Sequence, residues 1–356
     1  MKKIISFVLG LCMTLSLGVG TLSGCAPKRE FKNIILVIGD GMGENHILNT
    51  IEYFDLETPA FMADQAGYIG TTSKNGVTDS AAAGTALATG NKVENGELAL
   101  HKNKELEQIT TIAQKAKMKT GVITTDTLDG ATPASFTAHS PTRSFTNKIM
   151  ETQAESGVNL LLGRSSSSYT LNEEVFTEKG YTIVEDEEEL VEAKGAKKLV
   201  GLLDDIDSEY LSGNELNFQL KDMTRFAIEY LENKNGFFLM IEGAYIDKHS
   251  HNNDLDGALC EARSLFDTIS YLYEYVADGE TALFITADHE TGSLAKANSK
   301  EELTNALYGT GNHSLTPVPI FVKNYTWKPE NFGYEVGATP ENTMVFEACK
   351  AIIKGE

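Results

Sequence analysis

Basic residues are scarce in this sequence. Its 356 residues include 30 Lys and Arg against 51 Asp and Glu, which gives a formal net charge of −21. Nucleic-acid backbones are held mainly by Lys and Arg, so this balance argues against nucleic-acid binding as a main role. It also repels anionic ligands at long range. A site for an anion must therefore supply its own positive charge, and metal ions are the obvious source.

Cysteines, linkers and long apolar runs are also rare. Only 4 Cys occur, too few to indicate a disulfide framework in a chain of this length. Cys260 and Cys349 could form one bridge, but we expect both to be core residues. Outside the N-terminus, no apolar run approaches the roughly 20 residues that span a bilayer. Without repeats or a Pro- or Gly-rich linker, the simplest organisation is one large domain over residues 33–356.

The N-terminus has the pattern of an export signal. Two lysines precede an apolar stretch that ends in Leu-Ser-Gly-Cys at 22–25, which is similar to a bacterial lipobox. We therefore expect residues 1–24 to be a lipoprotein signal peptide and 25–32 a short tether. Lipidation of Cys25 would anchor the mature chain to the outer face of the cell membrane. The alternatives are an ordinary signal peptide, or an uncleaved anchor with a chance Cys.

Apolar runs alternate with helix-period segments along the rest of the chain. This pattern predicts a three-layer α/β fold, with a largely parallel central sheet and helices on both faces. The expected strands are Asn33–Ile38, Gly121–Thr124, Asn159–Leu162, Tyr181–Val184, Lys198–Leu203, Phe237–Ile241, Thr281–Thr286 and Val318–Val322. The clearest helices are Leu106–Lys119, Phe145–Ser156, Leu220–Glu232, Leu255–Val276 and Asn342–Ile352. The acidic run 185–189 is expected to be the solvated start of another helix.

Three of the predicted strands are followed by carboxylates, namely Asp40, Glu242 and Asp288. The carboxyl ends of parallel strands form one edge of a sheet, so these acids can converge although they are far apart in sequence. A bare cluster of acids repels itself. The arrangement is therefore typical of a site that binds cations.

Histidines accompany these acids. Asp247 and His251 are four residues apart, which places both on one face of a helical turn. His289 follows Asp288, and His313 lies on a Gly-flanked loop. Asp and His without Cys suit zinc, whereas all-oxygen ligands suit magnesium. Each motif alone also has an ordinary explanation, such as a helix cap or a core histidine, so it is their joint placement that indicates a metal site.

Small residues follow Ser80 in the segment 76–86, Gly-Val-Thr-Asp-Ser-Ala-Ala-Ala-Gly-Thr-Ala. Such residues allow a nucleophile to open a helix against a crowded sheet edge. The backbone donors at the helix start would bind a phosphate group and favour the alkoxide. The alternative is a Ser that merely caps an Ala-rich helix.

Together these segments resemble the motifs of the alkaline phosphatase family, in the family's order, from about Asn33 to Val322. The segments that carry the resemblance are Asp40–Gly43, Thr78–Ala81, Lys92 with Asn95–Gly96, Ala131–Ala134, Gly236–Leu239, Glu242–Lys248 with His251, Thr286–His289, and His313. The resemblance implies an alkaline-phosphatase-like fold. It also implies hydrolysis of small phosphate monoesters to an alcohol and inorganic phosphate.

The resemblance further implies two Zn²⁺ ions and one Mg²⁺ ion. The implied ligands of the first zinc are Asp247, His251 and His313. The second zinc, which also contacts the hydroxyl of Ser80, has as its implied ligands Asp40, Asp288 and His289. The magnesium ligands are implied to be Asp40, which bridges to the second zinc, Thr132 and Glu242.

Three side chains match the family's catalytic groups. Ser80 corresponds to the nucleophile that forms a phosphoserine intermediate. Arg143, eleven residues after Thr132, matches the arginine that grips phosphate, whose planar fork can bind two oxygens at once. Lys248 matches a lysine that reaches phosphate and the magnesium site through water.

One position departs from the family's pattern. An Asp or His that binds magnesium-bound water commonly stands two residues before Thr132, where this chain has Gly130. Asp129 is adjacent in sequence. We expect a weak, exchangeable magnesium site that Gly130→Asp would tighten, unless Asp129 reaches the metal water through a shifted loop.

Other functions compete with this interpretation. A phosphodiesterase or another phosphoryl hydrolase of the same superfamily is the main alternative, because two zincs and a hydroxyl nucleophile also serve diesters. A lipoprotein that only sequesters metal or phosphate is a non-enzyme alternative. The sequence has no Cys/Ser-x-Pro-x-Arg segment of the kind that a sulfatase requires. A homodimer is common in the family, but the short span between His289 and His313 leaves little room for an insert that would strengthen a dimer contact.

Overall fold

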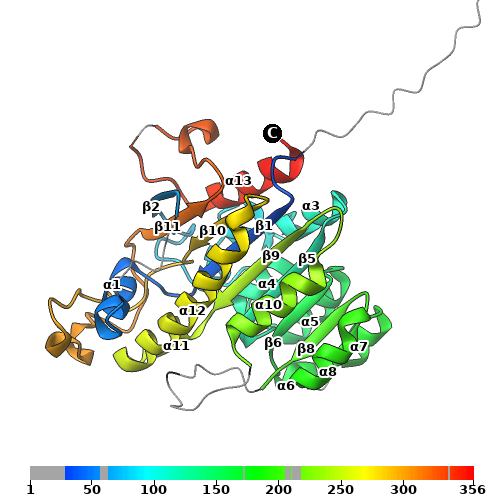
Figure 1. The fold of residues 1–356 in the computed structure, drawn as a ribbon, viewed down its shortest axis with the longest axis horizontal. Coiled ribbons are helices and arrows are strands. Elements are labelled where there is room, and N and C mark those ends of the chain that lie inside the picture. Colours follow the sequence, from blue (N-terminus) through cyan, green and yellow to red (C-terminus); the bar gives the residue numbers. More distant parts are fainter. Residues whose placement is uncertain (1–28, 57–62, 171–172, 205–209, 211–217, 336) are drawn as a thin grey trace, which may run out of the picture.

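The computed structural model describes residues 29–56, 63–170, 173–204, 210, 218–335 and 337–356 (Figure 1). The segment that carries Cys25 lies outside these residues, so the expected signal peptide, tether and lipid anchor stay predictions. Within the described part of the chain, none of the helices combines the length and apolar character needed to cross a bilayer.

The middle layer of the described residues is a nine-stranded sheet with the order β2-β11-β10-β1-β9-β5-β6-β8-β7. All neighbouring strands pair in parallel except β11, which runs antiparallel to both β10 and β2. The strands are β1 (Asn33–Gly39), β2 (Gln65–Ile69), β5 (Lys119–Thr127), β6 (Leu160–Arg164), β7 (Thr182–Val184), β8 (Leu199–Leu202), β9 (Phe237–Gly243), β10 (Thr281–Thr286) and β11 (Val318–Lys323). A separate hairpin pairs β3 (Leu100–His101) with β4 (Lys104–Glu105).

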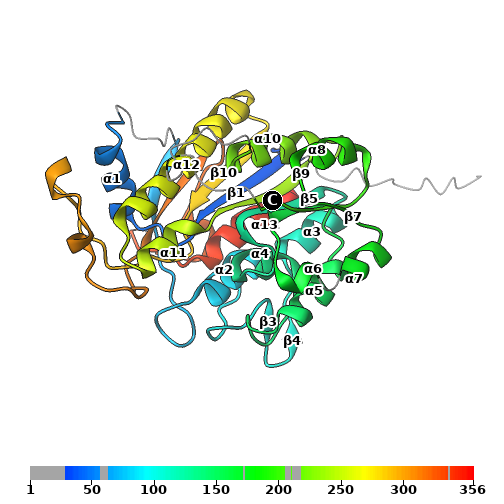
Figure 2. The same ribbon diagram turned by 90° about the horizontal axis from the view of Figure 1, so that it is seen from below.

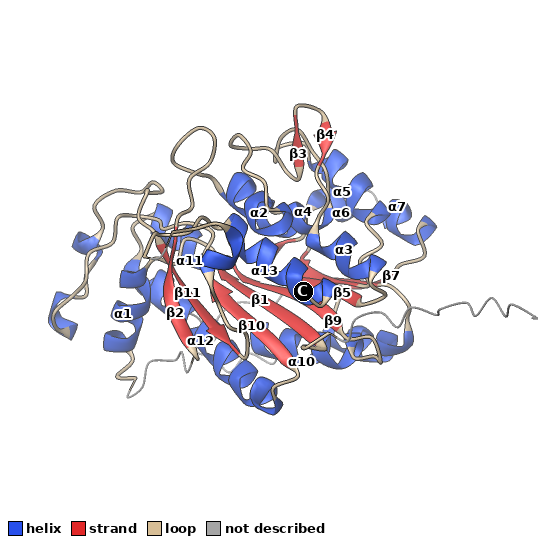
Figure 3. Ribbon diagram, turned by 90° about the horizontal axis from the view of Figure 1, so that it is seen from above, coloured by secondary structure: helices blue, strands red, loops and turns tan. Residues whose placement is uncertain are grey.

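Helices cover both faces of this sheet, as Figure 3 shows. One face carries α10 (Leu220–Leu231) and α12 (Leu255–Tyr275). The other carries α2 (Ser80–Thr89), α3 (Ile109–Lys115), α4 (Ala131–Thr137) and α13 (Thr343–Lys354). The other α-helices within the described residues are α1 (Glu44–Tyr53), α5 (Thr146–Glu155), α6 (Ser167–Thr170), α7 (Glu173–Glu178), α8 (Glu187–Glu192) and α11 (Tyr245–His251). The three-layer α/β fold predicted from the sequence is confirmed.

The central strands form because they are continuous apolar runs that both helical layers cover. Every residue of β1, β9 and β10 is buried. Burying one large aliphatic side chain stabilises the fold by about 1.5–3 kcal/mol, so these strands contribute much of the driving force for folding. Cys260 and Cys349 are both buried, as expected, and no disulfide joins them in the described structure.

Most predicted elements are confirmed, but the boundary between α3 and β5 was predicted wrongly. The sequence pattern extended the helix to Lys119, whereas α3 ends at Lys115. Lys117 has a φ of 63°, a left-handed conformation that a continuing helix does not allow. Lys119 instead begins β5, where it pairs with Phe237 of β9.

The carboxyl ends of β1, β9 and β10 meet at one edge of the sheet. The register pairs Ile38 of β1 with Thr286 of β10 and with Glu242 of β9. In Figure 2, α2 and α11 both lie toward the end of β1. Ser80 at the start of α2 and Asp247 of α11 are both close to His289, which follows β10. The strand-end carboxylates, the Ser80 helix and the Asp247 helix are thereby brought to one place.

Candidate active site

The strand-end acids meet as the sequence predicts. Asp40 follows β1, and its backbone N–H donates to the carbonyl oxygen of Gly243 at the end of β9, 3.1 Å away. Asp288 follows β10 and accepts a hydrogen bond of 3.1 Å from the backbone of Gly41. Both carboxylates are buried. The backbone around the strand ends therefore fixes two acids close to each other in the protein interior.

Asp40 and Asp288 share a partner, His289, and the ligand atoms of all three lie within 4.8 Å of one another. Nε2 of His289 is 3.2 Å from Oδ2 of Asp288 and 3.5 Å from Oδ1 of Asp40. Those two carboxylate oxygens are buried, and neither has a hydrogen-bond partner among the described residues. Buried charged oxygens without hydrogen bonds are costly. A cation between these three side chains would satisfy them.

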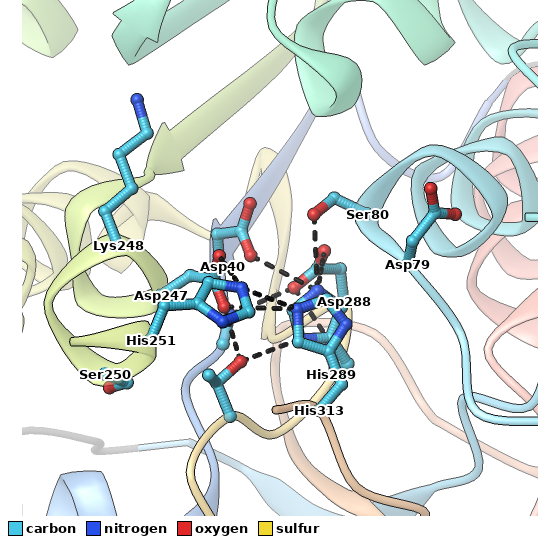
Figure 4. Close-up of polar contacts among 12 residues, drawn as sticks. Asp40, Asp79, Ser80, Asp247, Lys248, Ser250, His251, Asp288, His289 and His313 are labelled. Atoms are coloured by element: carbon cyan, nitrogen blue, oxygen red, sulfur yellow. Dashed lines mark hydrogen bonds and ion pairs between the residues drawn. The ribbon is translucent and has the colours of Figure 1, made fainter. Parts of the chain in front are cut away.

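A second group contains Asp247, His251 and His313 (Figure 4). Nε2 of His251 lies 3.2 Å from Oδ2 of Asp247, and Nε2 of His313 lies 3.5 Å from Oδ1 of the same carboxylate. The two Nε2 atoms are 3.0 Å apart. Asp247 is held by the hydroxyl of Thr291, which donates to Oδ1.

The tautomers of His251 and His313 follow from their other ring nitrogens. Nδ1 of His251 lies 2.7 Å from the carbonyl oxygen of Gly311, and Nδ1 of His313 lies 2.8 Å from that of Thr78. A carbonyl oxygen only accepts, so both Nδ1 atoms must carry the proton. In the neutral rings both Nε2 atoms then present lone pairs to each other at 3.0 Å. Such a contact needs either a proton on one Nε2 or a metal ion between the rings, and metal-binding histidines are usually oriented in this way.

Ser80 is the first residue of α2, and its hydroxyl points into the cluster (Figure 4). Its Oγ lies 3.3 Å from Nε2 of His289. The preceding residue, Asp79, caps the helix by accepting a hydrogen bond of 2.9 Å from the backbone of Ala82. The N-terminus of a ten-residue helix favours negative charge at Ser80.

Arg143 lies at the rim beside this helix. Its guanidinium is 3.7 Å from Oδ2 of Asp79, and its side chain is 42% exposed. The same Asp79 oxygen accepts a hydrogen bond of 3.0 Å from the backbone of Gly96, and Gly96 in turn accepts one of 2.8 Å from the backbone of Arg143. Asp79 thus connects the start of the Ser80 helix to the arginine.

The remaining predicted residues form a neighbouring group. Glu242 is buried and accepts a hydrogen bond from the hydroxyl of Thr124 on β5. Thr132 is also buried, and its Oγ1 completes no hydrogen bond, although it lies close enough to Glu242 to favour that group's ionised form. Lys248 forms an ion pair with Asp126. In Figure 4 the Lys248 side chain extends away from the histidines.

Burial and mutual repulsion raise the pKa of the strand-end acids. The pKa of Asp40 is raised well above its usual value by burial and then by the charges of Asp288, Asp247 and Glu242. Burial, followed by the charge of Asp126, raises the pKa of Glu242 to about 8. These shifts show that the protein alone does not balance the negative charge of this edge, which is the electrostatic setting of a cation site.

In contrast to Asp40 and Glu242, Asp247 has a lowered pKa. Burial opposes ionisation of Asp247, but hydrogen bonds with His251 and His313 outweigh it and lower the pKa. The hydrogen bond with Asp247 raises the pKa of His251 to about 9. Desolvation lowers the pKa of His289, which is fully buried. Asp247 is therefore ionised at neutral pH and available to a metal ion.

The structure also identifies site residues to which the sequence analysis assigned no role. Asp79, Thr124, Asp126 and Thr291 each contact a predicted residue. A carboxylate directly before a helix-opening Ser is a recognisable N-cap, so Asp79 could have been found from the sequence. The other three depend on contacts between distant segments.

The segment before Thr132 carries two carboxylates, Asp126 and Asp129, with different partners. Asp129 accepts a hydrogen bond of 2.9 Å from the hydroxyl of Ser166. It is Asp126 that lies beside Lys248. One carboxylate oxygen of Asp129 is thus engaged by Ser166, and the expectation that Asp129 reaches the magnesium site stays a prediction.

Comparisons with known proteins agree with this site. The model of the alkaline phosphatase family matches residues 31–161 and 148–348. Alkaline phosphatase 3 of Bacillus subtilis is 31% identical over 333 residues, 83% of this chain and 71% of that protein. Alkaline phosphatase 4 of the same organism is 32% identical over 75% of this chain, and the match spans 63% of that protein's length.

The solved structures include the alkaline phosphatase of the Antarctic bacterium TAB5. It superimposes with a TM-score of 0.78 and 29% sequence identity, covering 92% of this chain and 99% of that one. Two variants of it, each with one histidine replaced by an acidic residue, are described as having Mg bound in the M3 site.

The fold and the convergent Asp, His and Ser side chains define a three-layer α/β protein with a site suited to phosphoryl chemistry. The chain belongs to the alkaline phosphatase family, a class of phosphomonoester hydrolases.

Proposed function

We propose that this chain is a metal-dependent alkaline phosphatase, which hydrolyses small phosphate monoesters through a phosphoserine at Ser80. The observation that carries the proposal is the pair of Nε2 atoms of His251 and His313, 3.0 Å apart and 3.2–3.5 Å from the Asp247 carboxylate. In both rings Nδ1 donates to a backbone carbonyl oxygen, so Nε2 is the atom that faces the cluster. Close to this pair stands a hydroxyl at the start of a helix, which supplies a nucleophile.

The donor sets fit the metals that the family resemblance implies. The first zinc would be held by Asp247, His251 and His313, which together offer two imidazoles and one carboxylate. The second would be held by Asp40, Asp288 and His289. Among the described residues, Oδ1 of Asp40 and Oδ2 of Asp288 are buried without a hydrogen-bond partner. Magnesium would take oxygen ligands from Asp40, Thr132 and Glu242. Magnesium in the M3 site of the TAB5 variants supports this third position.

Ser80 carries the covalent step. Bound zinc would lower the pKa of its hydroxyl and balance charge on the phosphate oxygens. Oγ of Ser80 forms a bond to phosphorus while the ester P–O bond breaks, and the alcohol leaves with a proton. Water then adds to phosphorus, the Oγ–P bond breaks, and Ser80 regains its proton as inorganic phosphate leaves.

Arg143 and Lys248 hold the phosphate oxygens in this proposal. The guanidinium of Arg143 is placed beside the Ser80 helix by Asp79, and its fork can bind two oxygens at once. Lys248, the residue after Asp247 on α11, adds an ammonium group. A monoester presents three free oxygens and a diester only two, so two cationic side chains favour the monoester over the phosphodiesterase alternative.

Metal analysis and a substrate panel on the purified mature domain test this proposal together. We expect zinc and magnesium in the protein as isolated, and faster turnover of a nitrophenyl phosphate monoester than of the matched bis(nitrophenyl) diester. Faster turnover of the diester would favour the phosphodiesterase alternative. Failure of the metal-loaded protein to hydrolyse any phosphomonoester would overturn the proposal and favour a binding protein.

We also propose that the chain is tethered outside the cell membrane through a lipid on Cys25. The support is the Leu-Ser-Gly-Cys ending of the N-terminal apolar stretch. Cys25→Ala should abolish fatty-acid labelling and move the protein out of the membrane fraction. Unchanged fractionation and labelling would contradict lipidation at this residue.

A further inference from the structure

The end of β5 carries a carboxylate that no sequence motif marks. Asp126 lies near the end of β5, and its Oδ1 forms an ion pair with Nζ of Lys248. Its backbone N–H donates a hydrogen bond of 2.8 Å to Oγ1 of Thr124, the same hydroxyl that donates to Glu242. Asp126 is therefore linked through Thr124 to a predicted magnesium ligand and is in contact with a predicted catalytic cation.

Gly130 explains how this carboxylate fits. A Cβ atom at position 130 would lie 2.8 Å from Oδ2 of Asp126 and 2.9 Å from the carbonyl oxygen of Thr127. The φ of Gly130 is −55°, so its backbone does not require glycine. Glycine is required because the Asp126 carboxylate occupies the space in which a side chain at position 130 would lie. Gly130 is the N-cap of α4, two residues before Thr132, so this space borders the proposed magnesium site.

The orientation of Asp126 is fixed from two sides. Its Oδ1 accepts a hydrogen bond of 2.7 Å from the backbone of Thr127 and also contacts Lys248. Its Oδ2 faces the position where a side chain of residue 130 would begin. The side chain is 18% exposed, so water can reach the carboxylate.

We infer that Asp126 is a positioning residue for the third metal ion of the proposed phosphatase, supplying from β5 the carboxylate that Gly130 cannot supply. It orients metal-bound water through Oδ2 and holds Lys248 through Oδ1. The inference depends on the proposed function in one respect, which is that a metal ion occupies the third site. In this chain, the role of the Asp or His that the family commonly has two residues before Thr132 is thus filled by Asp126 instead.

The test is calorimetric titration of Mg²⁺ into chelator-treated, zinc-reloaded protein, which measures binding without turnover. Groups that orient metal-bound water commonly contribute 10–100-fold in affinity, so Asp126→Asn should weaken Mg²⁺ binding by roughly that factor. Asp129→Asn is the matched control, since it removes the neighbouring charge that is directed to Ser166. The control should bind Mg²⁺ like the wild type.

Monoester turnover as a function of Mg²⁺ concentration provides the second readout. In Asp126→Asn the half-activating concentration should rise, with much of kcat recovered at saturating Mg²⁺. Wild-type Mg²⁺ affinity in Asp126→Asn together with reduced kcat would overturn the inference, since Asp126 would then act only through Lys248. Equal weakening by Asp129→Asn, or a wild type that is active and binds no Mg²⁺, would also overturn it. An inactive wild type that nonetheless binds Mg²⁺ would count against the proposed function alone.

Discussion

Ser80 and His289 lie 209 residues apart in sequence, and their side chains approach to 3.3 Å between Oγ and Nε2. The first residue of α2 thereby faces a histidine that follows β10. Because His289 also contacts Asp40 and Asp288, the hydroxyl lies at the border of the second proposed zinc site.

Replacing the hydroxyl tests whether this contact carries the chemistry. Ser80→Ala should reduce monoester turnover by about 10³-fold or more and abolish covalent labelling by phosphate. Zinc content should change little, because the Asp and His ligands remain. Ser270→Ala is the control, because it removes an exposed hydroxyl that donates to the backbone of Phe266 in the same helix, α12. Near-wild-type turnover in Ser80→Ala would place the nucleophile elsewhere.

Metal removal should lower stability, because the strand-end acids then repel one another without compensation. Zinc that binds only the folded state adds about 2.7 kcal/mol to the free energy of unfolding at a free concentration one hundredfold above Kd. We therefore expect chelation to lower Tm and zinc to restore it, as measured by differential scanning calorimetry.

Two histidines of similar geometry provide the matched variants. Nδ1 of His313 and Nδ1 of His139 each lie 2.8 Å from a backbone carbonyl oxygen, but only His313 belongs to the cluster. His313→Ala should lose most of the zinc-dependent rise in Tm, whereas His139→Ala should retain it. An equal response of both variants to zinc would contradict the proposed ligand set.

The fold was largely predictable because its signal is local. β10 was predicted residue for residue, since all six of its side chains are buried and the run is uninterrupted. β2 was missed because it lies at the edge of the sheet, where its residues alternate between partly buried and exposed and include Gly67. An edge strand that is half exposed carries too weak an apolar pattern to be distinguished from a loop.

The site was predictable where its residues belong to strand ends and short motifs. Asp40 and Asp288 could be placed together because parallel strands deliver their carboxyl ends to one edge. The partnership of Asp126 with Lys248 spans 122 residues and follows no spacing rule. The space beside Gly130 is likewise a property of packing, which the sequence does not display.

The burial of His46 leads us to predict that the free energy of unfolding decreases at acidic pH. It is completely buried, with Nδ1 accepting a hydrogen bond of 3.2 Å from the backbone of Gly43 and Nε2 3.0 Å from Oγ of Ser250. Burial lowers its pKa to about 4, against the ordinary value of 6.5 for an exposed imidazole. Between these two values the unfolded state binds the additional proton, so the free energy of unfolding falls as pH falls.

The expected loss between pH 7 and pH 4 is about 3 kcal/mol, from 1.36 kcal/mol per pKa unit. Denaturant unfolding at several pH values measures it. His46→Gln keeps polar atoms at the site but cannot titrate, so its stability should depend less on pH in this window by that amount. The same pH dependence in wild type and variant would exclude His46 as the source.

Gly130 gives a prediction opposite to the one that the sequence suggested. From the family pattern, Gly130→Asp was expected to tighten the magnesium site. In the structure, any side chain at this position meets Oδ2 of Asp126 at 2.8 Å and the backbone oxygen of Thr127 at 2.9 Å. Gly130→Ala should therefore displace Asp126, weaken Mg²⁺ binding and cost about 1–3 kcal/mol of stability through overpacking. Gly130→Asp should weaken binding too, because it adds a second carboxylate beside the first.

A control exists at Gly195, where a Cβ atom meets nothing within 4 Å. Gly195→Ala should leave Mg²⁺ affinity unchanged and alter the free energy of unfolding by less than about 1 kcal/mol, since replacing an unstrained glycine mainly restricts the unfolded chain. Calorimetric Mg²⁺ titration and denaturant unfolding of Gly130→Ala, Gly130→Asp and Gly195→Ala compare the three directly. Tighter Mg²⁺ binding in Gly130→Asp would show that the loop makes room at position 130, and that Asp126 is not what requires glycine there.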